Sequence, residues 1–476
     1  MAKSLRQETV NGIFWSSVER FSVQGIQFLV MLVMARLLTP KDYGIVGMIT
    51  VFIGFAEVLI DSGFSQALIR KKERSEIDNC TVFYFNIISS IFLYFIMYFS
   101  APLVAGFYSM ESLEKYVRVV CLAFIINAIA IVPRANYTAN VDFKTQTKAS
   151  IWGVVSSSAV GISLALLGFG PWAIVFQLLT NQFVSTIFLF IYSKWKPKLL
   201  YSWKSFNEMF AFGSKLLATG IINAIYSNLY TIVIAKLFSP TVLGNYSRAQ
   251  QCAQYPSSNL TQIFQRVTFP ILCKANDDLD RLESIYRKML RCAAYVVFPL
   301  MVGMSALAKP LVIFLIGEQW INCIYLLQIV CFSMMWYPIH AINLDILQVS
   351  GRSDLFLKVE IYKKVIGVSA LLASAPFGIV AMCYVGILNS LICLYINNYY
   401  TARILKITLW TQFGDFMHII FLCGLMFFSV YAVTLFIAVP WLSVILGIIV
   451  GGIVYIGGSY VFHFDELAEL IRFFKK

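Results

Sequence analysis

Long apolar runs separated by short polar segments fill this 476-residue sequence and constrain its fold more than any other feature. Most of the fourteen runs are roughly 18–27 residues long, enough for a helix to cross a ~30 Å hydrocarbon core at 1.5 Å per residue. A segment surrounded by lipid must pair its own backbone groups, so each run is predicted to be helical. They lie near residues 12–38, 43–66, 80–106, 116–133, 149–169, 171–192, 209–236, 241–271, 291–316, 322–349, 358–377, 378–400, 413–437 and 440–462.

The composition excludes a soluble globule. Hydrophobic residues make up 59% of the chain and charged residues 13%, about half the usual quarter. Ten cysteines are scattered along the chain, most of them within the apolar runs, with no spacing typical of a metal site, and the three histidines lie far apart. The sequence therefore predicts an all-α polytopic membrane protein without a metal or another cofactor.

The distribution of Lys and Arg predicts the orientation. With the N-terminus in the cytoplasm, the inside segments carry 27 basic residues and the outside segments carry 6. Such a bias is the positive-inside pattern. It places both termini in the cytoplasm and assigns the net charge of +13 to topology and anionic lipid rather than to nucleic acid.

An internal repeat relates the two halves at an offset of 200 residues. Residues 33–44 read VMARLLTPKDYG and residues 233–244 read VIAKLFSPTVLG, with five identities that include Pro40/Pro240 and Gly44/Gly244. Six spans separate the copies, so both have the same orientation, as in two-lobed transporters. We therefore expect a six-helix lobe over 1–200, a second over 201–400, and two appended helices with a tail over 401–476.

Several segments resemble one family, the polysaccharide-transporter branch of the multidrug/oligosaccharidyl-lipid/polysaccharide (MOP) exporter superfamily. Its WzxC-like flippases share two six-helix lobes and two extra C-terminal helices. The segments that carry the resemblance are Asp61–Ile69, Tyr246–Gln251, Phe298–Gly303, Gly317–Trp320 and Gly351–Glu360. They are packing and loop patterns, so they indicate the family better than the substrate.

The resemblance implies a transporter, not an enzyme, in the bacterial inner membrane. Its substrate would be an undecaprenyl-pyrophosphate-linked oligosaccharide of an O-antigen, capsule or exopolysaccharide, moved by alternating access. The sugar and pyrophosphate would pass through a cationic cavity while the prenyl tail stays in lipid. A polysaccharide polymerase and a chain-length protein are the partners that such a role implies.

Beyond the 27 inside and 6 outside basic residues, the remaining four are assigned to the interior of the predicted spans, where a charge is costly and needs a reason: Arg20, Lys215, Arg248 and Arg266. Guanidinium groups bind phosphate oxygens through two parallel hydrogen bonds, so these residues are candidates for contacting the pyrophosphate and sugar. The alternative for Lys215, Arg248 and Arg266 is that their side chains reach the membrane interface. Arg20 is predicted to lie deeper.

The acidic candidates are Glu19, Glu57, Asp61 and Asp345. Glu57 and Asp61 have i,i+4 spacing, and two carboxylates on one helix face can bind Na⁺ or share a proton that couples transport to an ion gradient. The alternative, which we favour, is that one of the two acids pairs with Arg20 while the other sits at the wet cytoplasmic end. From the depths of spans 1 and 2, we predict an Arg20–Glu57 pair in the cavity between the lobes.

Other functions compete with a flippase for oligosaccharides. A cation-coupled small-molecule exporter shares the two lobes but usually stops at twelve spans. A membrane polymerase or ligase would need a long outer loop with catalytic residues, and the longest outside segment here has only about ten to sixteen residues. A lipid II flippase would work by the same mechanism with a different sugar.

Overall fold

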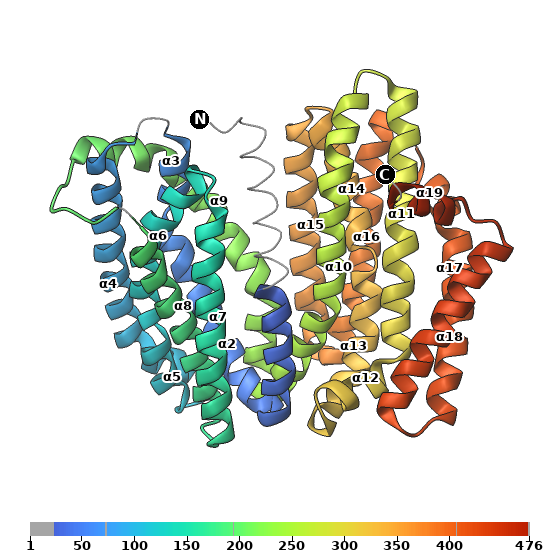
Figure 1. The fold of residues 1–476 in the computed structure, drawn as a ribbon, viewed down its shortest axis with the longest axis horizontal. Helices are drawn as coiled ribbons and strands as arrows, with labels where there is room; N and C mark the ends of the chain where they lie inside the picture. Colours follow the sequence, from blue (N-terminus) through green and yellow to red (C-terminus); the bar gives the residue numbers. More distant parts are fainter. Residues whose placement is uncertain (1–22, 72–73, 194, 406, 475–476) are drawn as a thin grey trace. The chain divides into compact units, whose positions relative to one another are not determined.

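The fold is a set of helices in two compact units, described in a computed structural model (Figure 1). The structure describes residues 23–474 apart from 72–73, 194 and 406, and all regular secondary structure in these residues is helical. Contacts divide the chain into unit 1, Met1–Gly244, and unit 2, Asn245–Lys476. This division falls inside one helix, α10 (Pro240–Ala275), whereas the lobe boundary after residue 200 stays a prediction from the repeat.

Unit 1 contains the helix Val23–Leu37, which precedes α2, and then eight labelled helices. Helices α7 and α8 pack most extensively, followed by α4 against α6 and α2 against α9. The eight helices are α2 (Pro40–Asp61), α3 (Phe64–Arg70), α4 (Glu76–Phe107), α5 (Leu113–Val120), α6 (Leu122–Ala139), α7 (Phe143–Leu166), α8 (Pro171–Tyr192) and α9 (Trp203–Leu237).

Unit 2 takes up the chain within α10 and continues to the C-terminus. Here α11 packs against α17, α17 against α18, and α15 against α16. Its helices are α10 (Pro240–Ala275), α11 (Leu279–Ala306), α12 (Ala308–Leu315), η1 (Glu318–Trp320), α13 (Ile321–Met334), α14 (Tyr337–Val349), α15 (Ser353–Ser374), η2 (Ala375–Phe377), α16 (Ile379–Leu405), α17 (Leu409–Phe436), α18 (Pro440–Val461) and α19 (Asp465–Phe474).

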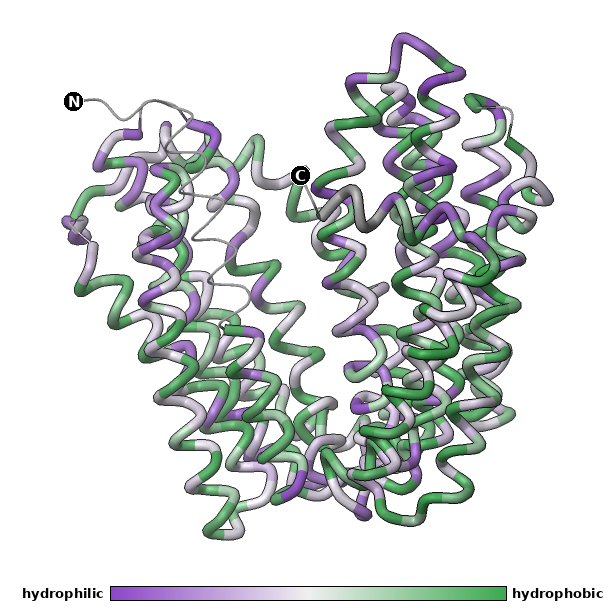
Figure 2. The backbone as a smooth tube through the Cα atoms, turned by 45° about the vertical axis from the view of Figure 1, so that its right-hand side comes forward, coloured by the Kyte–Doolittle hydropathy of each residue, from purple (hydrophilic) through white to green (hydrophobic). Residues whose placement is uncertain are grey.

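Eleven helical segments of the described chain are long and apolar enough to span a membrane, which confirms a polytopic all-α protein. Figure 2 shows long hydrophobic stretches along the helices of each unit, with hydrophilic stretches gathered near helix ends. The other three predicted spans are also helical where the structure describes them. Val23–Leu37 is short in its described part, while α10 and α15 carry many polar or charged residues and fall outside the eleven. A total of fourteen spans therefore stays a prediction.

The helix starts follow from capping residues that the sequence displays. Thr39 accepts a hydrogen bond from the backbone of Asp42, whose carboxylate bonds back to Thr39, and Pro40 occupies the first turn of α2. Ser239 likewise accepts from the backbone of Val242 at the start of α10. A hydroxyl cap followed by proline satisfies free N–H groups and fixes φ for a helix. Both copies of the repeat thus begin a helix at their shared proline, Pro40 in α2 and Pro240 in α10, close to the predicted span starts near 43 and 241.

The two repeat copies also meet through their glycines, within unit 1. A Cβ atom on Gly44 would lie 1.7 Å from the carbonyl oxygen of Pro240, and one on Gly244 would lie 1.8 Å from that of Pro40. Only a residue without a side chain allows these backbones to approach so closely. The shared glycine of the repeat therefore has a reciprocal packing role.

Candidate functional site

Helix α10 carries the most conspicuous polar surface of unit 2. It has 36 residues, longer than a membrane-spanning helix needs, yet it is not among the eleven apolar segments. Five of its polar side chains are buried: Asn245, Arg248, Ser257, Thr261 and Thr268. We call the row of polar side chains from Asn245 to Arg266 the polar course of α10. Polar residues along a helix of this length indicate a route or binding site for a polar ligand. The polar residues from Asn245 onward include Gln250, Gln251, Gln254, Ser258, Asn259, Gln262, Gln265 and Arg266.

Arg248 is buried near the start of this course, with 2% of its surface exposed. Its Nη1 donates to Oε1 of Gln251 at 2.9 Å, and its guanidinium carbon lies 5.3 Å from the ring centre of the buried Trp320. Arginine commonly stacks on an aromatic face in this way. The structure thus holds the guanidinium inside unit 2 rather than extending it to an interface.

Arg266 and Lys215 differ from Arg248 because both are exposed on their helices, α10 and α9. Next to Arg266, Gln265 donates from Nε2 to Oδ1 of the buried Asp345 at 3.0 Å. The second carboxylate oxygen of Asp345 is buried without a hydrogen-bond partner in the described chain. Asp345 therefore joins α14 to the polar course of α10.

The acids of α2 have separate surroundings. Asp61 accepts hydrogen bonds from the backbone N (3.1 Å) and the Oγ (2.6 Å) of Ser65, so its carboxylate caps the first turn of α3. Glu57 is half-buried, and the basic group that acts electrostatically on it among described residues is Arg134. Glu19 and Arg20 lie outside the described residues, so the Arg20–Glu57 pair stays a prediction.

Sequence reasoning missed Arg134 as a site candidate. It counted this residue with a cytoplasmic segment, whereas α6 continues to Ala139 and includes it. The available signal was the further small and aromatic residues Ala135, Tyr137 and Ala139, which extend the apolar run beyond Pro133. The structure adds a basic residue to the charges within the helices of unit 1.

A buried amide and phenol cluster in unit 2 also escaped the sequence analysis. Nε2 of Gln412 donates to the Tyr286 hydroxyl, and the same nitrogen lies 3.2 Å from Oδ1 of Asn343. Tyr286 also donates to Asn343, and all three side chains are buried. These contacts join α11, α14 and α17 through polar groups, while Nδ2 of Asn343 and Oε1 of Gln412 are buried without a hydrogen-bond partner among the described residues.

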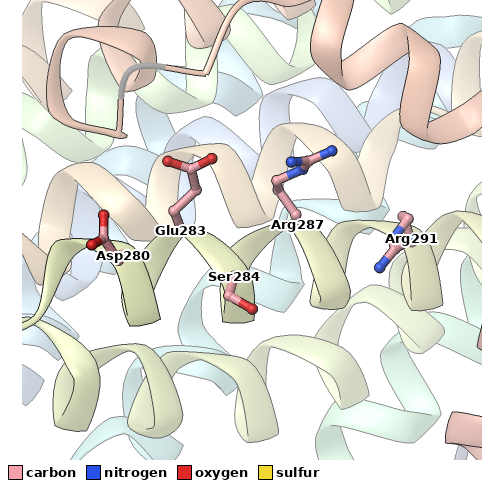
Figure 3. A pocket seen from close by; sticks show the side chains of 5 residues that line it. All are labelled: Asp280, Glu283, Ser284, Arg287 and Arg291. Carbon is pink, nitrogen blue, oxygen red and sulfur yellow. The ribbon is translucent and has the colours of Figure 1, made fainter.

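Charged residues gather along one face of α11, where they line a cavity of about 400 Å³ (Figure 3). Arg287 binds both carboxylate oxygens of Asp415 in α17, at 2.9 and 2.6 Å. Lys288 reaches Glu469 of α19 at 2.6 Å, and His418 lies 3.4 Å from the buried Glu466. Ion pairs therefore connect α11 to α17 and to α19. The cavity lining consists of Asp280, Glu283, Ser284, Arg287 and Arg291.

An apolar groove of about 490 Å³ also lies in unit 2. Gly303 lines it from α11, Leu307 from the junction of α11 and α12, Met426 from α17, and Gly447 and Gly451 from α18. Small residues on α18 keep the groove open, because a glycine leaves space that a larger side chain would fill. Among described residues, no cluster of His, Cys, Asp and Glu is arranged to hold a metal ion.

Comparisons with known proteins agree with this architecture. The chain is 24% identical over 417 residues to the teichuronic acid biosynthesis protein TuaB of Bacillus subtilis, covering 87% of this chain and 86% of TuaB. It is 25% identical over 376 residues to the lipopolysaccharide biosynthesis protein WzxC of Escherichia coli, covering 77% and 75% of the two chains.

Two solved structures share the fold. The lipid II flippase MurJ, in an inward closed conformation, superimposes with a TM-score of 0.78 at 15% identity, covering 96% of this chain and 100% of MurJ. An inward-facing MATE multidrug transporter of the MOP superfamily gives a TM-score of 0.62 at 15% identity, covering 83% and 99%. The family model for polysaccharide biosynthesis proteins matches residues 33–325, more than half of the sequence. The chain therefore belongs to this family of polysaccharide biosynthesis proteins, with the fold of the MOP transporters.

Proposed function

We propose that this protein moves an undecaprenyl-pyrophosphate-linked oligosaccharide from the inner to the outer leaflet of the bacterial cytoplasmic membrane. It acts as a transporter rather than an enzyme, with both termini in the cytoplasm. The names of TuaB, WzxC and the succinoglycan transport protein ExoT of Rhizobium meliloti support a substrate that serves polysaccharide synthesis.

The observation that carries the proposal is the chemical contrast inside unit 2. The polar course of α10 offers amides, hydroxyls and the guanidinium of Arg248, whereas the groove between α11 and α18 is apolar. A lipid-linked oligosaccharide needs both environments, because its sugar and pyrophosphate are hydrophilic and its prenyl chain is not. A small amphipathic drug would not need a spanning helix as polar as α10.

The candidate residues take the following roles in this proposal. Arg20, Lys215, Arg248 and Arg266 contact the pyrophosphate or sugar, and Asp345 with Glu19, Glu57 and Asp61 provides ion coupling or charge pairing. A Na⁺ or H⁺ gradient supplies the driving force, as charged acids within spans allow. A polysaccharide polymerase and a chain-length protein receive the product on the outer side.

Reconstituted liposomes test the proposal. Purified protein should move a fluorescent pyrophosphate-linked glycolipid across the bilayer, and an imposed Na⁺ or H⁺ gradient should change the rate. Export of small cationic dyes without movement of the glycolipid would favour the exporter alternative and overturn the proposal.

Single-cysteine labelling tests the orientation. Cysteines at positions 200 and 280 should react only from the cytoplasmic side, and cysteines at positions 41 and 112 only from outside. The opposite pattern would contradict the proposed topology.

A further inference from the structure

A polar cavity lies inside unit 1. It has a volume of about 310 Å³ and is lined by α6, α7, α8 and the helix Val23–Leu37. Ligand sites commonly span about 300–1,000 Å³, so this cavity suits one sugar ring rather than a whole oligosaccharide. The polar lining residues are Gln27, Arg134, Gln146, Ser150, Asn181, Gln182 and Ser185.

The wall formed by α7 and α8 is closely packed. A Cβ atom on Gly153 would lie 1.9 Å from Oγ of Ser185 and 2.8 Å from Oδ1 of Asn181. Oγ of Ser185 in turn donates to Oδ1 of Asn181 at 3.3 Å. Glycine at position 153 therefore lets α7 hold these two polar side chains in fixed positions at the cavity.

A second amide, that of Gln146 in the first turn of α7, is fixed by hydrogen bonds to α6. Nε2 of Gln146 donates to the backbone oxygen of Arg134 at 3.1 Å and to Oγ1 of Thr138 at 2.9 Å. These bonds use the amide donors and leave Oε1 as an acceptor for a ligand hydroxyl. On α8, Oε1 of Gln182 is buried and has no hydrogen-bond partner among the described residues. A buried acceptor without a partner is costly, and a ligand hydroxyl would satisfy it.

The charge of the cavity is positive. Arg134 is its one charged residue among the described lining, and a guanidinium binds a carboxylate with two parallel hydrogen bonds. Arg134 also attracts the carboxylate of Glu57 in α2 electrostatically, and Glu57 is not part of the lining. A sugar carboxylate can therefore share the Arg134 guanidinium with Glu57, or it can displace the Glu57 carboxylate from that guanidinium.

We propose that this cavity is a subsite for a single acidic sugar residue, a hexuronate. Gln146, Asn181 and Gln182 bind its hydroxyls, and Arg134 binds its carboxylate. This inference rests on the proposed function, since it names one part of the oligosaccharide that the protein carries. It assigns recognition of that sugar to unit 1 alone.

Binding of two simple glycosides to the full-length protein in nanodiscs tests this subsite. Methyl β-D-glucuronide should bind at least ~10-fold more tightly than methyl β-D-glucoside, a difference of about 1.4 kcal/mol. Arg134→Gln and Gln182→Leu should each weaken glucuronide binding by at least ~10-fold, whereas Arg134→Lys should retain part of it. Melting temperatures of all variants show whether each is folded.

Gln177→Leu is the matched control. Gln177 lies on α8, as Gln182 does, but packs beside Gly161 and does not line the cavity, so this variant should bind the glucuronide like the unmodified chain. Equal binding of the two glycosides, no saturable binding, or insensitivity to both cavity variants would overturn the inference.

The outcome can be separated from that of the proposed function. Transport of the glycolipid without glucuronide binding would overturn only the subsite. Glucuronide binding without glycolipid transport would overturn only the flippase proposal.

Discussion

Helices α2 and α10 are the two copies of one repeat, and they begin alike but then differ in chemistry. Each starts at a hydroxyl cap and a proline, and each has a glycine against the carbonyl of the other copy's proline. At the offset of 200, Ile45, Met48 and Val51 of α2 correspond to Asn245, Arg248 and Gln251 of α10. The repeat preserves the backbone geometry of the helix start, while the side chains beyond it have diverged.

This difference shows that the residues that set the backbone geometry of the repeat are not the residues that set its ligand chemistry. Met48 and Arg248 are both buried, at 1% and 2% exposure, so their positions are equally enclosed. The enclosure alone does not require a cation at either position. The local partners Gln251 and Trp320 are what allow the Arg248 side chain to be buried.

The largest effect is expected from placing the α10 residue into α2. Met48→Arg buries a charge among apolar side chains, and an uncompensated buried charge costs about 3–5 kcal/mol. We expect little folded protein by size-exclusion chromatography. The converse variant, Arg248→Met, should keep most of the melting temperature but reduce glycolipid transport. Normal expression of folded Met48→Arg would contradict the inference that a buried arginine needs local partners like those of Arg248.

The next largest effect tests what the copies share. Gly44→Ala and Gly244→Ala each place a Cβ atom within 2 Å of a backbone oxygen, and such overpacking typically costs about 1–3 kcal/mol or more. We expect similar decreases in melting temperature for both. Gly54→Ala is the control, since its Cβ would meet only the Asn228 amide at 3.5 Å. A large effect at only one of the two glycines would contradict the reciprocal packing.

An intermediate effect concerns Arg20 and Glu57, the predicted charge pair, whose counterparts at the offset of 200 are the uncharged Gly220 and Ser257. We expect Arg20→Ala to abolish glycolipid binding, because Arg20 is proposed to hold the pyrophosphate. Glu57→Gln should leave binding intact or tighter but slow turnover, because the carboxylate no longer displaces the substrate. Binding, transport and melting temperature measured together decide this. A parallel loss of stability in both variants would indicate a structural pair instead.

The smallest effect lies outside the spans, at the start of α15. Arg352 donates to both carboxylate oxygens of Asp354 at 3.0 Å, and this hydrogen bonding lowers the pKa of Asp354 to about 2. Because the folded-state pKa is depressed, the pair stabilises the fold above about pH 4 and the contribution is lost as the pH falls toward 2. Arg352→Gln should return the pKa toward about 3.9, as a ¹³C NMR titration of the labelled carboxyl would show. Since both side chains are exposed, the melting temperature at pH 7 should hardly change.

The sequence by itself determined the helical membrane fold, the positions of most helices and the repeat. These features depend on local rules, since lipid requires every backbone group to be paired within its own helix and capping residues mark where helices begin. The same local rules placed Arg248 and Asp345 within helices, as the structure shows. They did not show that α6 continues through Arg134 or that Asp61 caps α3.

Only the tertiary structure decided which of these side chains meet. The pairing of Asp345 with Gln265, the stacking of Arg248 on Trp320 and the cavity between α6, α7 and α8 join residues far apart in sequence. In a chain where nearly every helix is apolar on most of its surface, hydropathy does not distinguish the face that packs from the face that meets lipid. Shape decides the packing instead, through small residues such as Gly44, Gly153 and Gly244 that let particular helices approach closely.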